Sequence, residues 1–489
     1  MKKLLKKLFC LTMALCLTCT CVACGTPDDD TPTIPPASEG VLAEIKEAYG
    51  DWTGKALEIK AIDKGLGVQW IKDAASTFNK ATGSKITVLA DETLNEGVAN
   101  FIESDSGSDV YFTFTSDVQW VRWSQRGLIV PISDIESKLD FKVDGFEQIG
   151  IYNSQRYIMP YVTSPSGLVY NQNYVNEIPS KGEFTQGTFP KTWQGLLDMC
   201  DSINEDWNKT VGSNKVVPFT YGGSVGDMDY VFFQLWAQID PDGYKAYFDQ
   251  DDLDISGESN KSLLVNEGSI KALDCVAKLF NTKQGSNGYY PSNTVSTYAS
   301  DSNLVAEQKF LNGQSVFTIT GDWFENEMRD YIEEIEADFY HFTTMPVVEE
   351  DGQSTISLGT PSTYFMIAAN GKNNNAEMAK KFLTYMASPY VGQIYMLSTG
   401  AANAFECEVP QGLTPFAQEV MNAWANSRVV VGGSGQIPHL TCAIGLQLAQ
   451  THKELATSAY TETLAREKIE ALYDIQYAGW NDCIKDFVE

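Results

Sequence analysis

The sequence has few basic residues and very few histidines. Its 489 residues include 35 lysines and arginines against 64 acids, and only three histidines. The formal net charge of −29 argues against nucleic acid as a partner, because phosphate binding needs a basic face. HExxH and Walker motifs are also absent. We therefore expect an acidic, soluble surface and neither a metal nor another cofactor.

Paired cysteines are lacking once the N-terminus is set aside. Five of the ten cysteines lie at or before residue 24. The other five are widely spaced and form no CxxC pair: Cys200, Cys275, Cys407, Cys442 and Cys483. An odd number at such spacing argues against a disulfide framework and a structural zinc site. Buried thiols are the expectation.

The only long apolar run lies at the N-terminus. Four lysines precede a mostly apolar run over residues 8–23, which is shorter than the ~20 residues of a membrane span. It ends in Cys-Val-Ala-Cys-Gly, which resembles the lipobox of bacterial lipoproteins, with Cys24 as the lipidated residue. An ordinary secretory signal is the alternative. Loss of residues 1–23 would remove four lysines and lower the charge from −29 to −33.

Residues 24–54 are then the lipidated cysteine and a flexible linker, because residues 25–40 are rich in Pro, Asp and Thr. The rest is too long for one compact core. Strand and helix patterns alternate along its first part: strand 57–62, helix 68–82, strand 85–89, strand 109–114 and helix 118–126. Such units form parallel sheets that bind ligands at the carboxyl ends of strands, where Asp63 and Lys64 lie.

Residues 157–173 contain two short apolar runs separated by a Ser-Pro-Ser-Gly turn, which predicts strand, loop and strand. We interpret this stretch as a hinge between two α/β lobes with a ligand between them. The predicted division has two discontinuous parts: residues 55–158 with 337–388, and residues 159–336 with 389–489. The chain would cross between the lobes about three times.

Catalytic motifs are few. Residues 222–226 match G-x-S-x-G after a predicted strand, which suggests the hypothesis of a serine hydrolase with His341 or His439 as base. Short Gly/Ser turns match this pattern by chance, and three histidines leave little choice of base. A glycosidase needs two carboxylates, but no local pattern selects a pair among 64 acids. The acidic residues 249–258 fail the calcium-loop pattern.

Aromatic residues are plentiful, with ten Trp and 23 Tyr. Trp323 follows a predicted strand at residues 315–319 and stands beside Gly and Asp, a position that suits a binding platform. Trp120 and Trp236 lie in predicted helices and are further candidates, with core packing as the alternative for each. Sugars place C–H faces on such rings and offer hydroxyls to carboxylates, amides and Lys. A cation held by rings and acids is the alternative ligand.

Six segments occur in a recognisable order: a β-α-β unit at 63–89, residues 109–131, the strand pair at 157–171, Pro190-Lys191-Thr192-Trp193, residues 310–323, and 376–388 with Gly400. In this order they resemble the extracellular solute-binding proteins of ABC importers, the sugar-binding group that includes maltose-binding protein. The resemblance covers most of residues 57–405. It implies a two-lobed, periplasmic-binding-protein-like fold with hinge crossovers and an interlobe ligand cleft.

The resemblance also implies ligand contacts. Asp63 and Lys64 match first-loop sugar contacts, Asp117 matches an acidic contact, and Trp323 matches an aromatic platform. Ser164 stands where the maltose binder has Glu, which argues against maltose specificity. By analogy, the loops at 161–166 and 359–363 face the same cleft and add Tyr161, Gly359 and Thr360.

The implied function is a substrate-binding lipoprotein without enzymatic activity, anchored on the extracytoplasmic face of the membrane. As a monomer, it would capture a carbohydrate, with an oligosaccharide favoured, and deliver it to the transmembrane subunits of an ABC permease. Alternatives are a binding protein for another polar solute, such as a polyamine or betaine, and a lipid-anchored hydrolase acting on glycans or esters.

Overall fold

The structure is a computed structural model that describes residues 37–104, 107–114, 119–249, 261–283, 289–291, 293–294, 297–349, 352–358, 363–432, 441–458 and 460–475. The predicted signal peptide and Cys24 lie outside these residues, as do Asp117, Gly359 and Thr360. Among the described helices, none has the length and apolar character needed to cross a membrane. The described residues also hold no group of three or more His, Cys, Asp or Glu side chains that could bind a metal ion.

The first sheet has the strand order β2-β1-β3-β16-β6. Its strands are β1 (Ala56–Ile62), β2 (Lys85–Asp91), β3 (Val110–Phe114), β6 (Ile158–Pro160) and β16 (Thr363–Ile367). β1 pairs in parallel with β2 and β3, and β16 pairs antiparallel with β3 and β6. The predicted β-α-β unit is therefore confirmed. Because β6 runs parallel to β3, the residues after β1, β3 and β6 emerge at one edge of this sheet.

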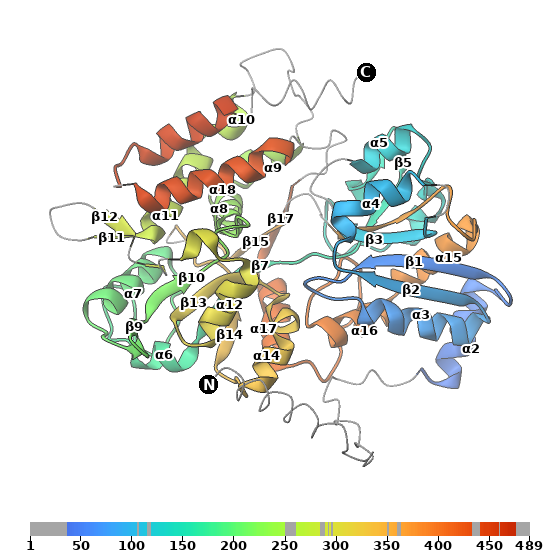
Figure 1. Cartoon of the computed structure of the whole chain (residues 1–489), viewed down its shortest axis with the longest axis horizontal. Coiled ribbons are helices and arrows are strands. Elements are labelled where there is room, and N and C mark those ends of the chain that lie inside the picture. The colour runs from blue at the N-terminus through green and yellow to red at the C-terminus, as the bar shows by residue number, and fades with distance from the viewer. Residues whose placement is uncertain are drawn as a thin grey trace, which may run out of the picture. The chain divides into compact units, whose positions relative to one another are not determined.

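Six helices belong with the first sheet: α2 (Glu39–Tyr49), α3 (Gln69–Thr82), α4 (Leu94–Ile102), α5 (Gln119–Gln125), α15 (Ala376–Met386) and α16 (Pro389–Thr399). Figure 1 shows α3 and α16 side by side below this sheet and α4 above it. α3 ends, as predicted, at Gly83, whose φ of 75° is left-handed. Its Trp70 is fully buried and stacks on Tyr161 with ring centroids 4.6 Å apart.

The second sheet has the order β10-β13-β7-β14. Its strands are β7 (Ser166–Asn171), β10 (Val217–Thr220), β13 (Ser315–Gly321) and β14 (Tyr340–Thr343). β10 and β13 are parallel, whereas β7 is antiparallel to β13 and places Ser166 opposite Gly321. The carboxyl ends of β10 and β13 and the start of β7 therefore share one edge. A separate parallel pair joins β15 (Thr355–Leu358) to β17 (Arg428–Val431).

Further helices are α6 (Gln172–Glu177), α7 (Trp193–Glu205), α8 (Met228–Ile239), α9 (Pro241–Asp249), α10 (Lys261–Leu264), α11 (Glu267–Phe280), α12 (Asn303–Leu311), α13 (Phe324–Glu327), α14 (Arg329–Glu334), α17 (Pro415–Asn426) and α18 (Thr441–Thr457), and residues 464–475 are helical as well. Short elements complete the described chain: β4 (Ile151–Tyr152), β5 (Gln155–Arg156), β8 (Thr210–Val211), β9 (Asn214–Lys215), β11 (Asn281–Lys283), β12 (Tyr289–Pro291), and the 3-10 helices η1 (Ser133–Lys138), η2 (Phe146–Gln148) and η4 (Tyr298–Ser300). α8 packs on the second sheet and on β15.

The chain passes from the first sheet to the second between β6 and β7, inside the stretch predicted as a hinge. The element contacts differ from the predicted division in two places. β14 pairs with β7 of the second sheet, although residues 337–388 were assigned to the first lobe. α16 packs against α3 of the first lobe, although residues 389–489 were assigned to the second. The chain therefore returns to the first lobe after β14, and it leaves that lobe again after α16. Both points lie later in the chain than predicted.

Cys200, Cys275 and Cys407 are free thiols. Cys200 and Cys275 are buried, as predicted, and Cys407 is partly exposed. Burial raises the pKa of the Cys275 thiol to about 12, so it is unreactive at neutral pH.

Candidate functional site

The loop after β1 and the helix after β13 meet each other. The side-chain amide of Asn326 on α13 donates a hydrogen bond of 2.5 Å to the carbonyl oxygen of Gly65. The Glu327 carboxyl accepts from the backbone amide of the same glycine. Gly65 has a φ of 58°, which a side chain would strain. Side chains of the second lobe therefore bind both the N–H and the C=O of this one glycine of the first lobe.

A second contact extends this connection. The guanidinium of Arg329 donates to the Asn326 side-chain oxygen at 2.9 Å and to the carbonyl oxygen of Ser398 at 2.8 Å. Ser398 lies at the end of α16, on the first lobe. Asn326 is therefore oriented by a charged neighbour, which leaves its amide hydrogens free to face Gly65.

Trp323 stands beside this contact and is partly exposed. Its ring lies edge-on to Tyr230 of α8, with centroids 5.4 Å apart and an interplanar angle of 62°. Tyr230 is 38% exposed, which is high for an aromatic residue. The pair forms an aromatic surface at the shared edge of β10 and β13, where a sugar ring or a cation could rest.

The orientation of the Trp323 indole depends on Gly321. A Cβ atom at Gly321 would lie 2.1 Å from Cζ3 of the indole, far inside van der Waals contact. The ring therefore lies back against the glycine backbone. Glycine is required here for space rather than for backbone conformation.

Three carboxyls lie behind the aromatic pair: Asp227, Glu307 and Glu327. Asp227 accepts from the Gly222 amide at 2.9 Å, and Glu307 accepts from the Thr320 hydroxyl at 2.5 Å. Burial raises the pKa of Asp227 to about 7 and that of Glu327 to about 7. Burial and the Glu327 carboxyl raise the pKa of Glu307 well above its usual value. At neutral pH this group is therefore incompletely ionised.

Several predicted site residues follow β1, β3 or β6 of the first sheet in the chain. Asp63 is half-buried and Lys64 exposed in the loop that carries Gly65. Ser164 has a φ of 33° and lies in the passage from β6 to β7. Trp120 on α5 is half-buried, whereas its neighbour Trp123 is 2% exposed.

Two predicted contacts are corrected by the structure. Tyr161 is fully buried in the first lobe and donates its hydroxyl to the carbonyl of Met386 at 3.0 Å. Trp236 is fully buried on α8 and packs against Tyr247 in the core of the second lobe. A solute could reach neither ring without unfolding its surroundings, so we remove both from the site.

Sequence reasoning missed Tyr230, Asn326, Glu327, Asp227 and Glu307. The segment 324–327 directly follows Trp323, so its polar residues could have been found by extending the predicted loop. Tyr230 lies on a mostly apolar helix, and the sequence carries no signal that this ring is partly exposed.

The G-x-S-x-G motif does not assemble a catalytic pair within the described residues. The Ser224 hydroxyl donates to the carbonyl of Asp301 at 2.8 Å. Nδ1 of His341 lies 2.6 Å from a carboxylate oxygen of Glu419, and His452 pairs with Asp229. His439 lies outside the described residues.

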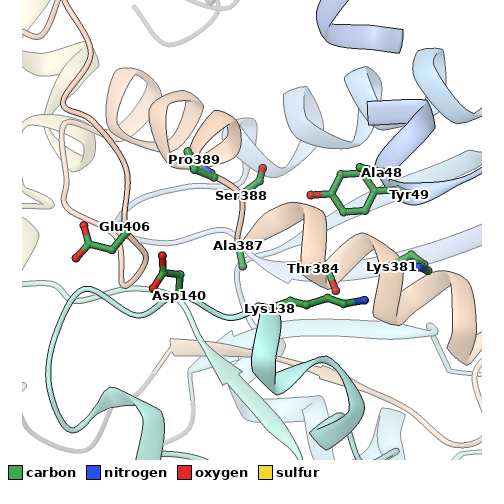
Figure 2. A pocket seen from close by; sticks show the side chains of 10 residues that line it. All are labelled: Ala48, Tyr49, Lys138, Asp140, Lys381, Thr384, Ala387, Ser388, Pro389 and Glu406. Atoms are coloured by element: carbon green, nitrogen blue, oxygen red, sulfur yellow. The ribbon is translucent and has the colours of Figure 1, made fainter. Parts of the chain in front are cut away.

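A different hollow, of about 350 Å³, lies on the first lobe. Figure 2 shows its lining: Ala48, Tyr49, Lys138, Asp140, Lys381, Thr384, Ala387, Ser388, Pro389 and Glu406. In that view the carboxylates of Asp140 and Glu406 lie near one another, and Lys138 and Lys381 lie toward the other end of the hollow. The hollow shares no residue with the aromatic pair or the three carboxyls.

Comparison with known families assigns the class of the protein. The sequence profile of the bacterial extracellular solute-binding proteins matches residues 64–392, about two thirds of the chain. The chain therefore belongs to this family of binding proteins associated with ABC transporters. A search among curated proteins finds no match.

Solved structures support the same two-lobed α/β fold. A probable secreted solute-binding lipoprotein from Streptomyces coelicolor has 14% identity and a TM-score of 0.63, over 87% of this chain and 100% of that one. The solute-binding protein RafE in complex with raffinose has 15% identity and a TM-score of 0.56, over 88% and 99%. AcbH, a bacterial solute receptor described as exclusive for β-D-galactopyranose, has 14% identity and a TM-score of 0.59, over 86% and 98%.

Proposed function

We propose that the protein is the substrate-binding lipoprotein of an ABC importer, and that it captures a carbohydrate between the loop after β1 and the helix after β13. The observation that carries this proposal is the exposed Tyr230–Trp323 pair, which lies where Asn326 of one lobe contacts Gly65 of the other. An aromatic surface binds the C–H face of a sugar, and nearby carboxyls and amides can bind its hydroxyls.

The relatives support a sugar as the solute, since RafE is described with raffinose and AcbH with galactopyranose. Within the proposal, the remaining contacts come from Asp63, Lys64, Trp120 and Ser164 and, outside the described residues, from Asp117, Gly359 and Thr360. No reaction and no cofactor are required. A solute that touches both lobes would stabilise the closed arrangement that a permease recognises.

The lipobox-like Cys-Val-Ala-Cys-Gly supports attachment through Cys24. The flexible linker predicted over residues 24–54 is too long, because Glu39–Tyr49 form α2, which packs on α3. In the proposal, the residues before α2 hold the folded part near the extracytoplasmic face of the membrane. We propose that the folded part acts there as a monomer with the transmembrane subunits of the permease.

A thermal-shift screen of the soluble chain tests the proposed function. One panel holds mono- and oligosaccharides, and a second holds polyamines, amino acids and betaines. A solute at 100 times its dissociation constant should add ~2.7 kcal/mol to the free energy of unfolding. We expect a saturable shift with one sugar class and no consumption of that sugar.

Shifts confined to the second panel would keep the importer role and discard the sugar. Turnover of a glycan or ester would instead support a hydrolase.

A further inference from the structure

We propose that closure of the two lobes takes up a proton, because the contact between Glu327 and the Gly65 loop depends on a proton that Glu327 shares with Glu307. Solute binding is therefore stronger at acidic than at alkaline pH. This inference rests on the proposed function, since it treats solute binding as a closure of the lobes. It assigns a regulation to that site and leaves the identity of the solute open.

The side chain of Glu327 joins the two lobes. Its carboxyl accepts a hydrogen bond from the backbone amide of Gly65, and its Oε1 atom lies 4.0 Å from the place of a Cβ atom built on that glycine. The Oε2 atom accepts from the side-chain amide of Asn303 in its own lobe at 3.3 Å. Asn326 binds the carbonyl oxygen of the same glycine through a neutral amide. Of these two side chains at Gly65, Glu327 is therefore the one that titrates.

The hydrogen bonds of Glu307 locate a proton beside Glu327. Glu307 is 1% exposed, and its Oε1 atom accepts from the hydroxyl of Thr320 at 2.5 Å. Its Oε2 atom receives no hydrogen bond from the described donors. A buried oxygen of this kind is satisfied when it carries a proton and donates it. The carboxyl of Glu327 is the acceptor, so the two carboxyls share a proton.

Burial between the lobes favours the protonated form of Glu327. Burial raises its pKa to about 7, and the donors Gly65 and Asn303 lower the pKa by a smaller amount. When the Gly65 loop withdraws, water reaches the carboxyl and its pKa falls toward the value of about 4.3 for an exposed glutamate. Between about pH 4 and 7 the joined lobes therefore bind more protons than the separated lobes. Closure is favoured at the acidic end of this window and weakens as the pH rises through about 7.

Other charged and titratable groups near the pair do not replace Glu327 in this role. Asp227 also titrates near pH 7, but it accepts from Gly222 of its own lobe, and no described contact joins it to Gly65. Lys309 and Asp229 are held in ion pairs within the second lobe. Further groups nearby are Tyr230 on α8, His452 on α18, Arg329 on α14, and Asp63 and Lys64 beside Gly65.

Calorimetric titration of the soluble chain with a neutral solute from the screen tests the inference at pH 5.5, 6.5, 7.5 and 8.5. A pKa difference of one unit between the joined and separated lobes changes the affinity by about tenfold. We expect the affinity to fall at least fivefold from pH 5.5 to 8.5. Titrations near pH 6.5 in two buffers of different ionisation enthalpy should show net proton uptake on binding.

An affinity that does not change with pH, without proton uptake, overturns the proton coupling and leaves the binding function standing. If the screen finds no solute, the proposed function fails, and small-angle scattering of the solute-free chain then decides the coupling alone. A larger radius of gyration at pH 8.5 than at pH 5.5 supports it, and equal radii overturn it.

Glu327→Gln provides the matched variant, because it keeps the size of the side chain and an acceptor oxygen for Gly65 but cannot titrate. Its affinity should change less than twofold over the same pH range. Glu334→Gln, at an exposed position at the end of α14, is the control and should retain the decline of the wild type.

If Glu327→Gln does not fold, Glu307→Gln is the second variant. Its amide donates permanently to Glu327 and replaces one carboxyl of the pair, so its decline should be at least twofold smaller than that of the wild type. A pH profile equal to that of the wild type, in whichever of the two variants folds, assigns the pair a structural role only and overturns the inference.

Discussion

At the residue scale, Trp323 illustrates how the position of a side chain depends on its neighbours. The indole is partly exposed because Gly321 leaves space beneath it and Tyr230 supports its edge. The sequence indicated Trp323, since a Trp directly after a strand and beside Gly and Asp is poorly placed for a core. It could not separate Trp323 from Tyr161 and Trp236, because their burial depends on elements far away in the chain.

Trp323→Ala should weaken solute binding by more than tenfold, worth over ~1.4 kcal/mol, because the sugar loses its aromatic surface. Calorimetry with the solute found in the screen measures this, and circular dichroism checks the fold. An unchanged affinity would remove Trp323 from the site.

Trp236→Ala should change the stability of the fold rather than the affinity for solute. The side chain is fully buried in the core, so its loss should lower the free energy of unfolding by about 3–5 kcal/mol. Denaturant titration measures this change. If the folded fraction of the variant bound solute much more weakly than the wild type, Trp236 would have to be returned to the site.

The raised carboxyl pKa values predict a pH dependence of stability. Glu327 and Asp227 titrate near pH 7 when folded, against about 4.3 and 3.9 in the unfolded chain. Between about pH 4 and 7 the folded chain therefore binds more protons, and these groups make stability fall as pH rises through that window.

Melting temperatures from pH 5 to 8 without solute, compared with those of Glu327→Gln, isolate this contribution. The variant should show a shallower decline, whereas Glu334→Gln should follow the wild type. Parallel curves for all three chains would contradict the raised pKa of Glu327.

At the scale of elements, the strands and helices could largely be predicted, because β1, α3, β2 and α15 have clear periodicity and clear ends. The lobe to which β14 and α16 belong could not be predicted. A four-residue strand pairs with whichever edge is free, here that of β7, and the partner is set by the folded sheet. α16 follows α15 after a Ser-Pro break, and the sequence does not show that its apolar face packs on α3.

The contact between α13 and the Gly65 loop gives a prediction at this scale. Asn326→Ala removes one hydrogen bond between the lobes, for which about 0.5–1.5 kcal/mol is expected. Solute affinity should fall a few-fold to about tenfold, and small-angle scattering should show a larger radius of gyration for the solute-free chain. Asn422→Ala, at an exposed position of α17, is the control. Unchanged affinity and scattering would mean that this contact does not contribute to closure.

At the scale of the whole molecule, the acidic charge bears on how the protein interacts with a membrane surface. The formal charge of −29 suits a free, soluble protein that does not adhere to an anionic membrane surface. Retention at the membrane would therefore depend on the lipid rather than on charge.

Cys24→Ala should move the protein from the membrane fraction to the soluble fraction, because it removes the thiol that would carry the lipid, and an acidic surface is not attracted to anionic lipid. Fractionation followed by immunoblotting measures this, with Cys407→Ala as a control that leaves the N-terminus intact. A variant that stays with the membrane would contradict the lipobox interpretation.

The glycine beneath the Trp323 indole has an evolutionary consequence. A single methyl group at position 321 would force the ring to swing away from the backbone, although that methyl group need not touch the solute. One nucleotide change that converts Gly to Ala could therefore alter which solute a descendant of this chain binds. Differences in solute choice among related binding proteins should therefore be sought beneath exposed aromatic rings as well as among the residues that touch the solute.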